Sequence, residues 1–170
     1  MRGLTKLPDS YFAKFTNKQV RLYPFNPKSR VVAKKYILKL ERLLSEFNLE
    51  IIHRGSTAFG IAGKGEIEIG VYPKTKDWTL VLKCLTKFIG KLDNLETNYA
   101  RFNDRFQDFE VEIIVLKGSD AKIDRQLTEY LKSNSEVLNQ YEKMKYQFAY
   151  SKKEYMIAKD KFFRKLVSKL

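Results

Sequence analysis

The sequence IIHRGSTAFGIAGKGEIEIGVY, residues 51–72, joins an apolar run, a glycine-rich loop and a second apolar run that carries two glutamates. The apolar runs predict two strands, with Gly55 and Ser56 leaving the first strand and Glu66 and Glu68 lying on the second. Because side chains alternate across a strand, we expect both glutamates on one face, opposite the isoleucines. Paired carboxylates beside a glycine loop indicate a site for metal and phosphate.

The composition is that of one globular domain. The chain has 170 residues, of which 44% are hydrophobic and 14% aromatic, which is enough to build a core without disulfides. The single Cys84 cannot form an internal disulfide, and no run is long and apolar enough to cross a membrane. The start of the chain has no stretch of signal-peptide type, so a reducing cytoplasm is the expected location.

The formal charge of +13 is concentrated at the two ends of the chain. Residues 1–30 hold seven Lys and Arg against one acid, and residues 141–170 hold nine against three. Such basic ends favour RNA or another polyanion as a partner and predict salt-sensitive binding. A lysine-rich solvated surface explains the same charge equally well.

The remaining pattern predicts an α+β fold with a small mixed sheet and a helical C-terminal tail. FQDFEVEIIVL (106–116) reads as a strand with Asp108, Glu110 and Glu112 on one face. Ser133 and Glu136 suit a capping box at the start of a tail helix. Further elements are expected as a strand over 95–102, helices over 30–47 and 81–92, and a short helix within LPDSYFAKF (7–15).

A third acid would complete a metal site with Glu66 and Glu68. Glu112 is available on the later strand, or Glu110 beside it. Mg²⁺ is held by carboxylate oxygens together with phosphates and waters, so acids converging from adjacent strands suit it. The alternative is that Glu110 and Glu112 form the charged outer face of an edge strand.

At these residues the chain resembles the nucleotidyltransferase superfamily typified by DNA polymerase β, whose core pattern is apolar-Gly-Gly/Ser followed by acid-apolar-acid-apolar. It resembles more closely the GrpB family of that superfamily. The similar segments are VRLYPFNP (20–27), IIHRGSTAFGIAGKGEIEI (51–69), LTEYLKSNSEVLNQYEKMK (127–145) and EYMIAKDKFF (154–163). The resemblance implies one domain with a nucleotidyltransferase-type sheet, a core over about 20–118 and a helical part over about 119–170.

Several positions depart from the GrpB pattern. The proline usual after Gly-Ser-Thr is absent, and Gly65 stands where the family usually has proline. Glu66 occupies a usually apolar position, and Glu68 replaces an aspartate. Glu110 and Glu112 fall where a His-x-His pair is common. These changes move the site towards the three-acid pattern of the wider superfamily.

The resemblance implies nucleotidyl transfer from a nucleoside triphosphate such as ATP to a hydroxyl group, with RNA as an acceptor suited to the basic ends. Glu66, Glu68 and Glu112, or Glu110 as third acid, would hold one or two Mg²⁺ or Mn²⁺ ions. Two alternatives stay open. One is a catalytically weak nucleotide- or RNA-binding module of the same fold, and the other is a transferase acting on a small phosphorylated metabolite.

Phosphate contacts are expected from the loop and from lysines. Gly55 and Ser56 would hold phosphates through backbone N–H groups and the hydroxyl. Lys64, Lys145 and Lys159 match lysines of the GrpB family, and would reach phosphates from the loop and the tail helices. For Lys145 and Lys159, a solvated position on a helix face is an equally good interpretation.

The remaining candidates have supporting roles. His53 is the only histidine and immediately precedes the motif, where a structural hydrogen bond is favoured over catalysis. Arg54 follows it, and Arg101 lies between the later strands as a weaker phosphate contact. The GrpB family carries an arginine where this chain has Thr128, and Arg125, one turn earlier, is the nearest substitute.

Overall fold

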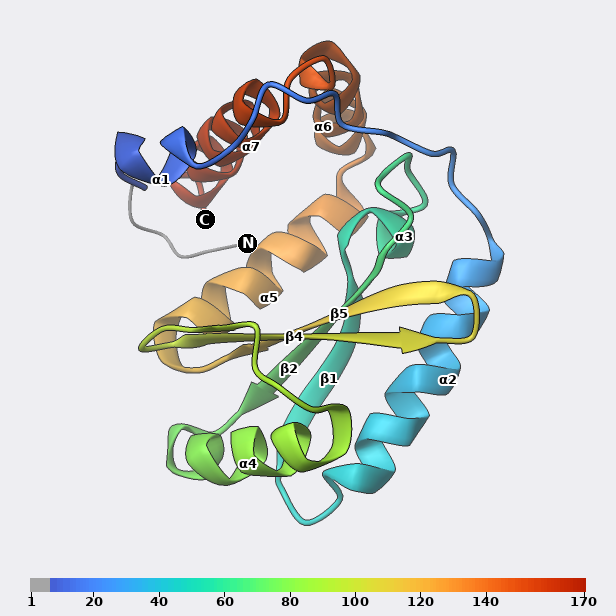
Figure 1. Ribbon diagram of the computed structural model, residues 1–170, viewed down its shortest axis with the longest axis vertical. Coiled ribbons are helices and arrows are strands. Elements are labelled where there is room, and N and C mark those ends of the chain that lie inside the picture. Colours follow the sequence, from blue (N-terminus) through green and yellow to red (C-terminus); the bar gives the residue numbers. More distant parts are fainter. Residues whose placement is uncertain (1–6) are drawn as a thin grey trace.

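The computed structural model describes residues 7–170 and contains one five-stranded sheet in the order β1-β2-β5-β4-β3 (Figure 1). Strands β2 and β5 are parallel, and every other neighbouring pair is antiparallel. The mixed sheet and the helical tail were both predicted from the sequence and are confirmed. The strands are β1 (Leu49–Arg54), β2 (Ile67–Pro73), β3 (Asn94–Leu95), β4 (Tyr99–Phe106) and β5 (Phe109–Leu116).

Helices cover both faces of the sheet and one end of it (Figure 1). The predicted helix over 30–47 is observed over 28–43, because the chain leaves helical geometry at Leu44. The helices are α1 (Asp9–Ala13), α2 (Lys28–Leu43), α3 (Gly55–Phe59), the 3₁₀ turn η1 (Thr75–Asp77), α4 (Trp78–Ile89), α5 (Gly118–Ser133), α6 (Ser135–Phe148) and α7 (Lys152–Val167).

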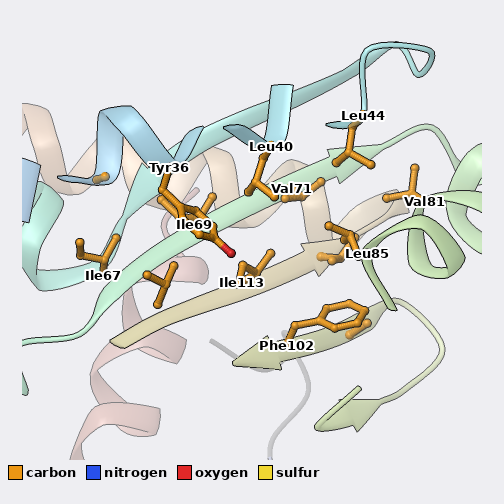
Figure 2. Packing of buried hydrophobic residues seen from close by; sticks show 14 of the residues in the cluster. Tyr36, Leu40, Leu44, Ile67, Ile69, Val71, Val81, Leu85, Phe102 and Ile113 are labelled. Carbon is orange, nitrogen blue, oxygen red and sulfur yellow. The ribbon is translucent and has the colours of Figure 1, made fainter. Parts of the chain in front are cut away.

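The main core lies between the sheet and helices α2 and α4 (Figure 2). Alternate residues of β2 and β5, such as Ile67, Ile69 and Ile113, are fully buried in it. Each such side chain contributes about 1.5–3 kcal/mol by leaving water. Tyr36 of α2 is also fully buried, and its hydroxyl donates to the Asp104 carboxylate at 2.6 Å. This core fixes which strand residues point to the opposite face.

The opposite face of the sheet carries the polar residues of the same strands. Glu68 and Glu112 are direct partners in the parallel register of β2 and β5. The predicted alternation is confirmed for Glu68 and Glu112, but the prediction that Glu66 lies on the same strand is wrong, because β2 begins at Ile67. Strand β5 lies between β2 and β4, so the interpretation of Glu110 and Glu112 as the outer face of an edge strand is wrong.

Helices α5, α6 and α7 pack together, and α5 also packs against the second face of the sheet. Helix α6 begins after Asn134, whose side chain accepts a hydrogen bond from the Val137 N–H at 3.1 Å. Ser133 instead ends α5, with its hydroxyl on the Glu129 carbonyl at 2.9 Å, so the predicted capping box with Glu136 is wrong. These helices and the glycine loop share a second hydrophobic cluster, which contains Ile61, Leu127, Leu131, Tyr141, Phe163 and Leu166.

The N-terminal segment crosses the junction of α6 and α7, as the blue ribbon in Figure 1 shows. The Val20 N–H donates to the Ala149 carbonyl at 2.7 Å, and the Lys152 N–H donates to the Lys18 carbonyl at 2.8 Å. Parts of the two basic ends of the chain thus lie side by side. Within residues 7–170, no helix is both long and apolar enough to span a bilayer.

Candidate functional site

The glycine turn brings Gly55 against the carboxylate of Glu68. Gly55 has φ +74°, a left-handed conformation that glycine adopts without the steric cost of a side chain. A Cβ atom at this position would lie 2.4 Å from Glu68 Oε1. Both the backbone and the close approach therefore require glycine. The predicted loop contains one short helix, α3, which begins at this residue.

Glu68 and Glu112 lie on the floor of a cavity of about 150 Å³. Helix α7 forms one wall of this cavity, with Tyr155 and Lys159 facing the sheet. Leu7 and Tyr11 of the N-terminal segment also line it. We call this space the main cavity. It combines carboxylates, cationic groups and aromatic rings, a mixture typical of ligand sites.

One of the three predicted acids, Glu66, does not join Glu68 and Glu112. Glu66 lies just before β2, and its carboxylate pairs with the Lys64 ammonium at 2.8 Å. Lys64 lines the main cavity, whereas Glu66 does not. Glu110 is exposed and lies opposite Arg105 in the β4–β5 register. The structure therefore brings together Glu68 and Glu112 only.

Glu112 already has a cationic partner. Arg101 Nη1 donates to Glu112 Oε1 at 3.2 Å, and Arg101 Nε donates to Asp93 Oδ2 at 2.7 Å. Arg101 thus holds a carboxylate of the site and also lines the main cavity. No three Asp, Glu, His or Cys side chains among residues 7–170 are grouped so that they could hold a metal ion. These residues do not fit the three-carboxylate Mg²⁺ site expected from the sequence.

Lys159 lines both the main cavity and a smaller one of about 30 Å³. Glu68 lines both cavities as well. Burial alone would raise the pKa of Glu68, but Lys159 and Arg54 outweigh it and lower the pKa to about 2. The pKa of Lys159 is raised by Tyr141 and by Glu68, against the effect of burial. Both groups are therefore charged at neutral pH.

The smaller cavity is lined by a buried ion pair of Arg54 with Asp124 of α5, at 2.9 Å. The Tyr72 hydroxyl donates to the other oxygen of Asp124 at 2.7 Å. Arg54 Nε and Nη1 are buried and have no hydrogen-bond partner in the described part of the chain. Thr128 lines the same cavity, so Arg54 brings a guanidinium beside it. The suggested substitute, Arg125, instead pairs with a surface glutamate at 2.9 Å.

Lys145 and Ser56 hold the glycine loop rather than line the main cavity. Lys145 is fully buried and its ammonium donates to Ser56 Oγ at 2.8 Å and to the Ala62 carbonyl. Burial, reinforced by Lys159, lowers the pKa of Lys145 to about 8. In this arrangement the lysine ties α6 to the loop, a role that helical spacing alone did not reveal.

His53 lies on the opposite side of β1 from Arg54. Its Nε2 atom is 3.0 Å from Thr57 Oγ1. Burial lowers the pKa of His53 to about 4, although Glu68 acts in the opposite direction. A neutral imidazole that is hydrogen-bonded to α3 agrees with the structural role favoured from the sequence.

Sequence reasoning missed several residues of the site. Tyr99 and Tyr155 line the main cavity, but strand and helix patterns treat both as ordinary core residues. A signal was available for Asp124, because it shares the buried face of α5 with Ala121 and Leu127. An acid on a buried helical stripe indicates a buried ionic partner.

Comparison with known proteins places the chain in a family. The family model for "GrpB protein" matches residues 19–169. The chain belongs to the GrpB family. The crystal structure of conserved protein GrpB from Enterococcus faecalis has a TM-score of 0.67 to this GrpB-family chain at 17% identity, covering 88% of this chain and 98% of that one. The shared fold is thus the GrpB fold.

More distant similarity reaches the Cid1 poly(U) polymerase. Its complex with the UTP analogue UMPNPP gives a TM-score of 0.44 at 10% identity, and a second structure of that polymerase gives 0.38 at 12% identity. In both cases the match covers 80% of this GrpB-family chain and 45% of Cid1. No curated protein matches the sequence.

Proposed function

We propose that the main cavity binds the phosphate-bearing end of a nucleotide or of another small phosphorylated molecule. The observation that carries the proposal is Lys159, which lines the cavity and is hydrogen-bonded to no described residue. Phosphate oxygens accept charge-assisted hydrogen bonds from an ammonium group. Lys64 of the glycine loop, which pairs with Glu66, also lines the cavity and brings a second ammonium group to it.

The size of the main cavity limits how the ligand enters. Its volume is about 150 Å³, whereas sites that enclose a whole ligand have roughly 300–1,000 Å³. The phosphates would therefore lie inside, and the remainder of the ligand would extend past the rim. Tyr155 offers an aromatic ring within the cavity.

The proposal does not depend on a resident metal. Arg101 and Lys159 supply positive charge beside Glu112 and Glu68, and a bound divalent ion would supply the same charge in a three-carboxylate site. The proposal therefore predicts that the ligand binds without Mg²⁺ or Mn²⁺.

A second candidate function is nucleotidyl transfer to a hydroxyl acceptor, including one on RNA. It is favoured by the register of Glu68 against Glu112, since these two carboxylates on adjacent strands are two of the three expected for such a site. A transferase acting on a small phosphorylated metabolite is the same chemistry with a smaller acceptor.

The first test is a thermal-shift titration of the whole protein with nucleoside triphosphates, nucleoside monophosphates and pyrophosphate. Each ligand is titrated once in EDTA and once in Mg²⁺. A ligand at 100 times its Kd stabilises the folded state by about 2.7 kcal/mol. The proposal predicts a rise in Tm with at least one of these ligands in EDTA. No rise with any of these ligands in EDTA would contradict it.

The transfer candidate needs a separate measurement. The protein is incubated with each labelled nucleoside triphosphate, Mg²⁺ or Mn²⁺, and total cellular RNA. Label on RNA or on a small acceptor that is lost in Glu68→Gln would establish transfer. Nucleotide binding without any label transfer would indicate that the protein is a nucleotide-binding module and not a transferase.

A further inference from the structure

We propose that the surface formed by residues 14–23 and 143–153 binds single-stranded nucleic acid. We call this surface the basic strip. The two segments are far apart in sequence, and three backbone hydrogen bonds join them. Val20 N–H donates to the Ala149 carbonyl at 2.7 Å, and the N–H groups of residues 152 and 153 donate to the carbonyls of Lys18 and Thr16 at 2.8 and 3.1 Å. Figure 1 shows the N-terminal segment passing over α6 and α7.

The charge of the basic strip has one sign. Its two segments contain seven Lys and Arg residues and no acid. Lys145 is buried beneath the glycine loop, whereas the other six are exposed or half-buried. Exposed cationic side chains on two adjoining segments that contain no acid suit a phosphate backbone. The exposed or half-buried cations are Lys14, Lys18, Arg21, Lys143, Lys152 and Lys153.

Exposed aromatic rings lie within the same strip. Tyr23, Tyr146 and Tyr150 are 43%, 56% and 63% exposed. Tyr146 lies in the last turn of α6 and Tyr150 just after that helix, and Arg21 lies over the Tyr23 ring at 5.1 Å. Rings on a basic surface stack on nucleic-acid bases while lysines contact the phosphates.

The side chains of the strip favour a single-stranded nucleic acid over a membrane or a duplex. Every large exposed hydrophobic side chain described in it is a tyrosine, so it presents no exposed aliphatic group for insertion into lipid. In a duplex the bases are already stacked and paired, and exposed rings gain no partner. In a single strand every base offers a free face.

The basic strip leads towards the main cavity. Tyr23 exchanges two backbone hydrogen bonds with Gly63 of the glycine loop, at 2.7 and 3.0 Å. Lys64, the next residue, lines the cavity. A strand lying on the strip would therefore pass close to the loop. Binding to the strip does not require any particular ligand in the cavity.

The test is fluorescence anisotropy with a labelled 12-nucleotide RNA, the DNA of the same sequence and the matching duplex, without added nucleotide. One variant is Lys18→Gln with Lys152→Gln, which keeps the backbone hydrogen bond between the two residues and removes the Lys152 ammonium from above the Phe15 ring. A second variant is Tyr146→Ala with Tyr150→Ala. The control is Lys83→Gln with Lys87→Gln, two exposed lysines of α4 on the far side of the sheet. Tm is measured for each.

We expect each strip variant to bind the single strand at least tenfold more weakly, and the control to stay within twofold of wild type. If about four cations contact phosphates, affinity should fall about 50-fold between 50 and 200 mM salt. Equal losses in the strip variants and the control would overturn the proposal, as would preference for the duplex. Binding to anionic lipid vesicles with none to the oligonucleotides would assign the strip to membranes instead.

Discussion

Replacing Gly55 by alanine tests how the glycine turn positions the carboxylate of the site. Alanine at φ +74° costs roughly 1–2 kcal/mol in backbone strain. Its Cβ atom would also lie 2.4 Å from Glu68 Oε1, so the carboxylate must move. The folded-state pKa of Glu68, about 2 instead of 4.5, corresponds to at most about 3 kcal/mol. Moving the carboxylate from Lys159 and Arg54 forfeits about 1–2 kcal/mol of this.

A double-mutant cycle separates the two contributions. In wild type, Gly55→Ala should lower the free energy of unfolding by about 2–4 kcal/mol, as the sum of strain and displacement. In a Glu68→Ala background only the backbone strain of about 1–2 kcal/mol remains. Gly118→Ala is the matched control, because Gly118 has φ +62° and a methyl group added there would meet nothing within 4 Å. It should cost only the strain.

Urea denaturation followed by circular dichroism measures all five proteins. A coupling of at least about 1 kcal/mol between positions 55 and 68 is expected. Equal losses from Gly55→Ala in both backgrounds would refute the contact with Glu68. No loss in either background would refute the left-handed backbone at this residue.

Three further predictions concern buried ionisable groups. Asp124→Asn should lower the free energy of unfolding by about 3–5 kcal/mol, because Arg54 would remain buried without its partner; a loss below 1 kcal/mol in urea denaturation would argue against the pair. The pKa of His53 is about 4 when folded and 6.5 when unfolded, so the unfolded chain binds more protons as pH falls. The free energy of unfolding should therefore drop by about 2 kcal/mol from pH 7 to pH 5. Urea denaturation of His53→Gln at both pH values should show a drop smaller by this amount. The pKa of Lys145 is lowered to about 8 from 10.5, so its contribution should rise between pH 8 and 10.5. The stability of wild type relative to Lys145→Met should therefore grow across that range, and a flat difference would contradict the burial of its ammonium.

Local patterns were sufficient to predict the fold and the floor of the site. Alternation predicted that Glu68 and Glu112 each point away from the core, since the apolar residues next to them on each strand had to enter it. The parallel pairing of β2 with β5 then made the two carboxylates neighbours. Glu66 failed as a partner because it lies just before the strand begins, where side-chain alternation no longer fixes its direction.

The roles of the cationic residues could not be predicted in the same way, because they depend on packing between distant elements. Lys145 and Lys159 lie on successive helices of similar composition. Only the docking of α6 on the glycine loop buries Lys145 against Ser56, and only the packing of α7 against α5 and α6 brings Lys159 into the main cavity. The pairing of Arg101 with Glu112 likewise crosses from β4 to β5.

The most direct test of the central claim is isothermal titration calorimetry of the best phosphorylated ligand in EDTA, with wild type, Lys159→Gln and Lys161→Gln. Lys161 is an exposed lysine of the same helix and does not line the main cavity. A charge-assisted hydrogen bond contributes about 1.5–3 kcal/mol, so Lys159→Gln should weaken binding about 10- to 100-fold and Lys161→Gln should not. Equal affinity for Lys159→Gln and wild type would contradict the account.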